Sequence, residues 1–263
     1  MTARIVVASV VDKDPLCVSE FLACLDLLEL PDAELGWMFS VPQDAPRLLA
    51  NMLARFTADH PGCVTIPGAS RDELLQGAVA GGASHVFVVE PTLLLPPPLV
   101  AHLLQLDLDI VTEVFWTRWQ PAAPYLPNVW ACDEYSFCGP AGVGSAPEAQ
   151  TTQAGAFLSL LHDAGTFRVG GVTGCTLISR RALLAGISFA RLPNLSLWDA
   201  ERHFSIRAAA LGFDLWADTH YPPLHLYRPT DLAMADHFWA RWARTGPVDE
   251  AQASLAELAP SIN

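Results

Sequence analysis

Acidic residues stand directly after two apolar runs in the first half of the chain. Asp12 follows the run 5–11, and Glu90 closes the run 86–89 and is followed by Pro91 and Thr92. A carboxylate at the tip of a buried strand suits a divalent cation that bridges a diphosphate. A strand-ending acid before a turn proline is the plainer interpretation, and Glu90 taken alone favours it.

A second acidic segment, Trp-Asp-Ala-Glu-Arg-His-Phe, precedes a helical pattern in the second half. A carboxylate at such a helix start can take a proton from an acceptor hydroxyl, and Glu201 is our candidate for this base. Asp199 is expected to cap the helix. The alternative for Glu201 is a favourable interaction with the helix dipole.

Glycines and histidines mark two further segments. Gly174 lies in a glycine-rich stretch over 170–179, where the backbone can come close to a ligand, although a bulged strand explains the glycines equally well. His220 and His225 follow the last apolar run. His225 can close a metal site with Glu90, while a lone histidine is more often structural.

Alternating elements must position these residues. Strands are expected at 5–11, 35–41, 63–66, 85–89, 108–114, 168–179 and 213–219, and helices at 15–28, 47–59, 71–80, from Pro97 or Pro98, at 201–211 and at 231–244. This alternation predicts an α/β fold with a mainly parallel central sheet flanked by helices, and ligands that bind beyond the carboxyl ends of the strands. The stretch 116–155 is expected to be ordered with little regular secondary structure.

Composition excludes several classes of partner. The 263 residues are 51% hydrophobic and carry a formal net charge of -13, which disfavours nucleic acid and anionic membrane surfaces. No apolar stretch approaches the ~20 residues of a membrane span. The six cysteines form no CxxC pair, and the first apolar run is too short for a signal peptide, so we expect a cytoplasmic protein with reduced thiols. No pattern specifies an oligomeric state.

The order of these segments resembles a known enzyme family. An apolar strand with an acidic tip, then GGVTGCTLISR, WDAERHFSIRAAALGF and DLWADTHYPPLHLYR, is similar to the inverting family 2 glycosyltransferases and their bacterial relatives with the GT-A fold. The resemblance covers roughly residues 4–229. It implies a catalytic domain at 1–229, with a nucleotide-binding half at 1–115 and an acceptor and catalytic half at 116–229, followed by a C-terminal helix and tail at 230–263.

The resemblance also implies a metal site and a base. The family's Asp-x-Asp motif holds Mn²⁺ or Mg²⁺ against the diphosphate of the donor, and here the degenerate motif Glu90-Pro91-Thr92 stands in its place. His225 matches the late metal-ligand histidine of the family. Ala200 and Glu201 match its acidic pair before the helix, so Glu201 would deprotonate the acceptor.

Donor and acceptor positions follow from the same resemblance. Arg71 starts a helix, and both its charge and the helix dipole suit a phosphate, although a solvated surface arginine is the alternative. The other positions expected near the nucleotide sugar are Asp12, Val41, Glu90, Thr92 and Gly174. The positions expected near the acceptor are Trp116, Trp130, Trp198 and Asp199. The tryptophans are included because aromatic faces stack on sugars, and the alternative for any single Trp is a satellite hydrophobic cluster.

The predicted function is transfer of a sugar from a nucleotide-sugar donor to an acceptor hydroxyl, with inversion and with help from a metal. The acceptor would be a small molecule or a glycan. The alternative is a GT-A-like protein whose altered metal site binds a nucleotide or sugar ligand or performs different chemistry. A Rossmann-type dehydrogenase is disfavoured because no GxGxxG motif follows the first strand.

Overall fold

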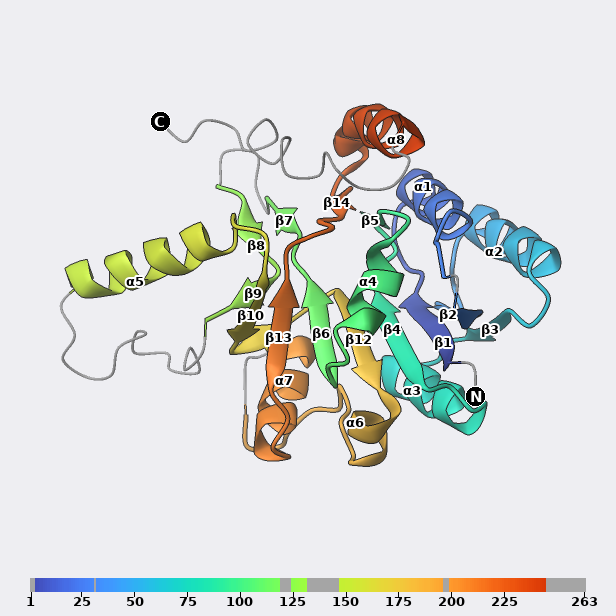
Figure 1. Cartoon of the computed structure of the whole chain (residues 1–263). Helices are drawn as coiled ribbons and strands as arrows, with labels where there is room; N and C mark the ends of the chain where they lie inside the picture. Colours follow the sequence, from blue (N-terminus) through green and yellow to red (C-terminus); the bar gives the residue numbers. More distant parts are fainter. Residues whose placement is uncertain (1–2, 31, 119–123, 132–146, 196–198, 245–263) are drawn as a thin grey trace.

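The apolar runs of the sequence form an eight-stranded central sheet (Figure 1). The computed structural model describes residues 3–30, 32–118, 124–131, 147–195 and 199–244. In spatial order the strands are β10 (Thr166–Val169), β13 (Leu215–Asp218), β6 (Ile110–Glu113), β12 (Cys175–Ser179), β4 (His85–Val89), β1 (Ala3–Val10), β2 (Ala33–Val41) and β3 (Val64–Pro67). The expected α/β fold with a mainly parallel sheet is confirmed.

Six of these strands run in one direction, and β10 and β12 run against them. The carboxyl ends of the six therefore share one edge of the sheet. β12 enters between β4 and β6, with Cys175 opposite Val89. The turn before β12 consequently lies at the same edge as the end of β4.

Two layers of helices cover the sheet. One face carries α1 (Pro15–Leu25), α2 (Arg47–Asp59), α4 (Leu99–Gln105) and α8 (Ala235–Arg244), and the other carries α3 (Arg71–Ala80), α6 (Arg180–Leu184) and α7 (Ala200–Ala210). Alternate residues of the central strands pack into two hydrophobic cores, one on each face of the sheet. Phe87 and Leu177 belong to the core under α1, α2, α4 and α8, and Val86 and Ile178 belong to the core under α3, α6 and α7. Burial on both faces explains why these strands appear as continuous apolar runs.

Short strand pairs surround the carboxyl edge. They are β5 (Leu93–Leu94) with β14 (Leu224–His225), β7 (Trp116–Thr117) with β8 (Leu126–Pro127), and β9 (Val129–Trp130) with β11 (Gly171–Val172). In the part of the chain that the structure describes, no helix has the length and apolar character needed to cross a membrane.

Three expectations about secondary structure differ from the structure. The stretch 116–155 contains the strands β7, β8 and β9 and the start of helix α5 (Pro147–Leu160), which extends to one side of the sheet (Figure 1). Its small and polar residues lack a clear apolar stripe, so periodicity did not reveal the helix. The predicted helix at 231–244 also divides, because a 3-10 helix (Pro229–Met234) precedes α8. The expected strand at 168–179 divides as well, into the end of β10, β11 and β12, with breaks at its glycines.

A buried amide joins the edge strands to the glycine-rich segment. The side-chain Oδ1 of Asn128 accepts a hydrogen bond from the backbone N–H of Phe115 at 2.9 Å. Its Nδ2 donates to the carbonyl oxygens of Thr173 at 2.8 Å and Glu113 at 3.1 Å. Asn128 thus holds three backbone segments together, because each of these polar groups needs a partner away from water.

Replacing Asn128 tests this role. Asn128→Ala leaves the buried N–H of Phe115 without its partner and removes one donor each from the carbonyl oxygens of Thr173 and Glu113, so we expect the free energy of unfolding to fall by about 1–3 kcal/mol. Chemical denaturation measures the change. Asn51→Ala, on the exposed side of α2, is the matched control and should stay within about 0.5 kcal/mol. Equal effects of the two variants would contradict the role of Asn128.

Candidate functional site

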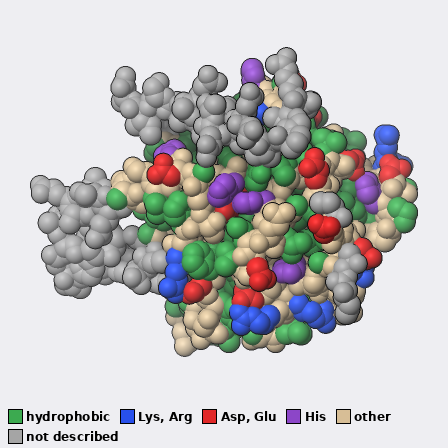
Figure 2. Space-filling view, viewed as in Figure 1, with side chains coloured by type: hydrophobic (Ala, Val, Ile, Leu, Met, Phe, Trp, Pro, Cys, Tyr) green, Lys and Arg blue, Asp and Glu red, His purple; other side chains and the backbone are tan. Residues whose placement is uncertain are grey.

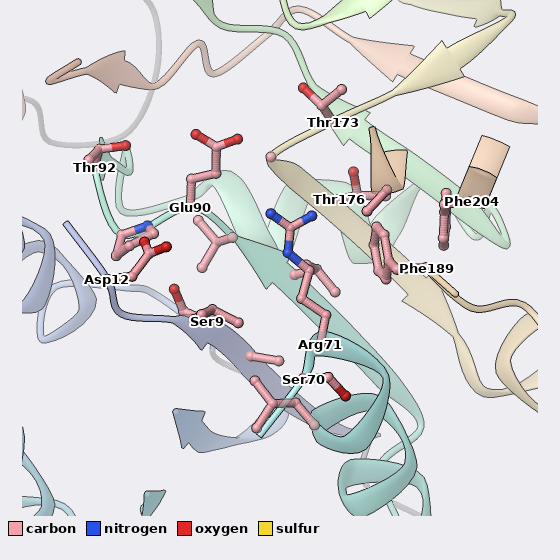
Figure 3. Close-up of a pocket in the computed structure, with 18 of the residues that line it drawn as sticks. Ser9, Asp12, Ser70, Arg71, Glu90, Thr92, Thr173, Thr176, Phe189 and Phe204 are labelled. Atoms are coloured by element: carbon pink, nitrogen blue, oxygen red, sulfur yellow. The ribbon is translucent and has the colours of Figure 1, made fainter. Parts of the chain in front are cut away.

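A cleft of about 910 Å³ opens at the carboxyl edge of the sheet, beyond β1 and β4 (Figure 3). Its walls come from the end of β1, the start of α3, the turn before β12, the start of α7 and the segment after β14. The lining side chains that could meet a polar ligand include Ser9, Asp12, Lys13, Arg71, Glu90, Thr92, Thr173, His225 and Tyr227. Parallel α/β sheets bind ligands at such an edge.

Gly174 fits closely against Glu90. The backbone N–H of Glu90 donates to the carbonyl oxygen of Gly174 at 2.8 Å. Gly174 has a φ of +69°, and a Cβ on it would lie 2.9 Å from Oε1 of Glu90 and 2.9 Å from the ring of Phe115. Only glycine tolerates this combination of backbone angle and close approach, so the glycine-rich turn fixes where the Glu90 carboxylate lies.

Glu90, Thr92 and His225 converge at one end of the cleft. Nε2 of His225 lies 3.1 Å from Oγ1 of Thr92 and 3.7 Å from Oε2 of Glu90. The antiparallel pairing of β14 with β5 places His225 beside the segment that follows Glu90. The structure therefore brings together both residues predicted to ligate a metal.

The charge states of this group suit a cation. Burial, with a contribution from Lys13, lowers the pKa of His225 to about 4, so its imidazole is neutral at neutral pH. Nδ1 of His225 is buried and has no hydrogen-bond partner among the described residues. A neutral imidazole beside a carboxylate and a hydroxyl is a ligand set that fits Mn²⁺, and the two oxygen ligands also suit Mg²⁺.

Burial also acts on Glu90. It raises the pKa of the carboxyl group, and the positive charge of Arg71 lowers the pKa again, while Glu201 raises it further. Smaller effects come from Lys13 and Asp12. The carboxylate thus lies in an environment that disfavours its charge, and a nearby cation would stabilise the charged form.

Arg71 links the two walls of the cleft. Ser70 caps α3 with a capping box formed with Glu73, and Ser70, Arg71 and Asp72 at this helix start line the cleft. The Arg71 guanidinium forms an ion pair with Glu201 of α7 and lies 5.3 Å from the ring centre of Phe189. In Figure 3 this guanidinium lies in the middle of the cleft, between Glu90 and Phe189.

Glu201 lies behind Arg71 rather than on the cleft surface. Its side chain is 13% exposed, and it is not among the described residues that line the cleft, whereas Ala200 is. Asp199 accepts a hydrogen bond from the backbone N–H of Arg202 at 3.0 Å, so the expected helix cap is present. Arg71 and Glu201 are 130 residues apart in sequence, and the sequence did not predict that they form a contact.

Besides Glu201 and Asp199, three predicted site residues within the described ranges lie outside the cleft lining. Val41 is buried, and its carbonyl oxygen accepts a hydrogen bond from the N–H of Gly68 at 2.7 Å. Trp116 stacks on His162 with ring centres 4.6 Å apart, and Trp130 packs against Gly171. These contacts match the alternative of a satellite cluster. Trp198 lies outside the described residues.

Several cleft residues were not predicted. Ser9 interrupts the apolar run of β1, and its buried Oγ has no hydrogen-bond partner among the described residues. That single polar residue within an apolar run was the available signal. Lys13 and Phe189 carried no signal, because only the fold brings them to the cleft.

Comparisons with known proteins concern the fold. No family model matches the chain, and no curated protein matches its sequence. Among solved structures, "Crystal structure of GalNAc-T7 with UDP, GalNAc and Mn2+" matches 86% of this chain and 44% of that chain, with a TM-score of 0.54 and 11% identity. The chain has the GT-A-type fold.

Two structures of TarS from S. aureus also match the fold of this chain. One matches 96% of this chain and 42% of its own length at a TM-score of 0.53 and 10% identity. The other, residues 1–349 of TarS, matches 94% of this chain and 67% of its own length at a TM-score of 0.50 and 10% identity. The GT-A-type chain thus spans less than half the length of GalNAc-T7 and of the longer TarS structure, and these similarities establish its fold.

Gly174→Ala tests the contact between the glycine-rich turn and Glu90. The positive φ alone should cost about 1–2 kcal/mol, and the contacts with Glu90 and Phe115 at least about 1 kcal/mol more. Gly212→Ala is the matched control, since Gly212 also has a positive φ, of +81°, but nothing within 4 Å of a Cβ. Denaturant unfolding compares the two variants, and equal losses would mean that the contact is unimportant.

Proposed function

We propose that the chain is a glycosyltransferase that moves a sugar from a nucleotide-sugar donor to an acceptor hydroxyl, with inversion. The observation that carries the proposal is the meeting of Glu90, Thr92 and His225 with Arg71 in one cleft of a GT-A-type fold. GalNAc-T7, a structural neighbour, was crystallised with UDP, GalNAc and Mn²⁺, which supports a donor of this chemical class.

Glu90 and His225 would hold Mn²⁺ or Mg²⁺, with Thr92 offering its hydroxyl. The cation, when bound, neutralises charge on the departing diphosphate. Arg71 would bind the diphosphate from the other side, where the start of α3 adds favourable N–H groups. Asp12 and Gly174 line the same cleft and would lie beside the donor.

The ion pair between Arg71 and Glu201 bears on how the base would act. A carboxylate that is paired with a guanidinium must leave that ion pair before it can contact an acceptor hydroxyl. When Arg71 turns to a bound diphosphate, Glu201 is released to take the proton of the acceptor hydroxyl. Binding of the donor would thus prepare the base before the acceptor reacts.

The acceptor would enter beside α7, where Ala200 and Phe204 line the cleft. Asp199 begins that helix, and Trp198 precedes it in the sequence. Trp116 and Trp130 have partners elsewhere, so a role for them in acceptor binding would require the acceptor to extend beyond the cleft. A small molecule or a glycan end fits this arrangement.

A second function has its own support. Thr92 replaces the acid expected at the second position of the metal motif, and it hydrogen-bonds His225 directly. This pair favours a GT-A-like protein that binds a nucleotide or sugar ligand without ordinary metal-assisted transfer. Isothermal titration with UDP and other nucleoside diphosphates, with and without Mn²⁺, separates the two functions. Absence of binding by any nucleotide sugar in the presence of metal would contradict transfer.

Glu201→Gln tests the base. The variant keeps the size of the side chain but cannot act as the base, so turnover should fall by roughly 10²-fold or more, while donor affinity is kept or rises because Arg71 no longer has to leave an ion pair. Initial rates at saturating donor and titration of the donor measure the two effects. Glu34→Gln, an exposed change at the amino end of β2, is the control. Full activity of Glu201→Gln would remove this residue from the mechanism.

Glu90→Ala tests the metal site. We expect donor affinity to depend on Mn²⁺ in the unchanged protein and to lose that dependence in the variant, because the carboxylate ligand is gone. Titration of the donor at several Mn²⁺ concentrations measures this. A donor affinity indifferent to both Mn²⁺ and the substitution would assign Glu90 a structural role only.

A further inference from the structure

A second group of potential metal ligands lies at the same sheet edge, on the other side of β12. His102 of α4, Asp218 at the end of β13 and His220 just after it bring one ligand atom each within 4.8 Å of one another. We propose that these three side chains form a binding site for a divalent transition-metal cation, with Zn²⁺ the best match. This proposal does not rest on the proposed transferase function.

The geometry is close to that of a metal site. Nε2 of His102 and Nδ1 of His220 each lie 3.0 Å from Oδ1 of Asp218. Tetrahedral ligands about 2.0–2.1 Å from a zinc ion lie roughly 3.3 Å apart, so small side-chain rotations would admit the ion. The backbone N–H of His220 also donates to the same Oδ1 at 3.0 Å, so three nitrogens crowd one oxygen atom.

The site has one buried and two accessible ligands. The side chain of Asp218 is 0% exposed, whereas those of His102 and His220 are 21% and 38% exposed. Histidine side chains gather near the middle of the face shown in Figure 2, with acidic side chains beside them. Three protein ligands and an open side toward solvent allow a fourth ligand from outside the chain.

Neighbouring groups orient the ligands from behind. Thr166 donates its hydroxyl to Oδ2 of Asp218 at 2.7 Å. Glu113, fully buried at the end of β6, is the strand partner of Asp218 in the pairing of β6 with β13, and it accepts the N–H of Tyr221 through Oε1 at 2.7 Å. Its Oε2 has no hydrogen-bond partner among the described residues. Such outer partners are characteristic of metal sites.

The ligand types select the metal. Two imidazoles with one carboxylate suit Zn²⁺ and neighbouring transition metals, whereas Ca²⁺ and Mg²⁺ prefer oxygen ligands. None of the three residues lines the cleft that holds Glu90 and His225. A bound ion would connect α4 to the end of β13, and the chain runs on from there into β14, which carries His225. The ion would therefore stabilise the wall of the cleft that carries His225, although the ion itself would lie outside the cleft.

Metal binding by the full-length chain tests the proposal. After removal of metals with a chelator, equilibrium dialysis against Zn²⁺ should yield one tightly bound ion per chain. His102→Gln and His220→Gln should each weaken binding by at least about 100-fold, and Glu113→Gln by about 10–100-fold. Co²⁺ in place of Zn²⁺ should give tetrahedral absorption bands without thiolate charge transfer, which separates this site from any cysteine site.

Controls decide the assignment. His60→Gln removes a histidine whose Nε2 lies 2.9 Å from Asp26 and whose Nδ1 lies 2.8 Å from the carbonyl oxygen of Phe56, and the variant should bind Zn²⁺ as the unchanged protein does. His225→Gln should also retain the ion, and circular dichroism checks that each variant is folded. The proposal is overturned if the unchanged chain binds no Zn²⁺, if folded His102→Gln and His220→Gln retain it, or if His225→Gln loses it.

Discussion

The insertion of β12 between β4 and β6 is the constraint on which the functional edge depends. Because β12 runs against its neighbours, the turn that precedes it must lie at the carboxyl edge, and Gly174 there meets Glu90. The same strand divides the acidic residues of the edge. Glu90 lies on the side of β1 and the cleft, while Glu113 and Asp218 lie on the side of α4.

Polar groups at this edge are supported by a small number of long-range contacts. Asn128 joins backbone atoms of three segments, and Asp218 collects hydrogen bonds from α4, β10 and its own loop. Arg71 joins α3 to α7 through Glu201. Each contact is made where an unpartnered polar group would be costly, so packing of the helices and placement of the site residues are coupled.

The sequence predicted the central sheet and its flanking helices but only part of the site. Continuous apolar runs located most strands to within a few residues, since burial on both faces leaves a clear pattern, but the glycine-rich run 168–179 covers three separate strands. Glu90 and His225 were paired as metal ligands from their residue types and from the resemblance, and the structure brings them together. The contact of Arg71 with Glu201 and the roles of Asn128 and Glu113 depend on tertiary proximity, which no local pattern encodes. Helix α5 lacked the apolar periodicity that would have revealed it.

The charges around the cleft have a kinetic consequence. Three acids, Asp12, Asp72 and Glu90, and two bases, Lys13 and Arg71, line it, within a chain of formal net charge -13. An anionic ligand therefore diffuses toward a repelling surface and is attracted only over the last few ångströms. Dissolved salt screens the long-range repulsion over about 10 Å at 0.1 M while leaving short contacts largely intact. Anions should thus associate faster as ionic strength rises, the reverse of electrostatic steering.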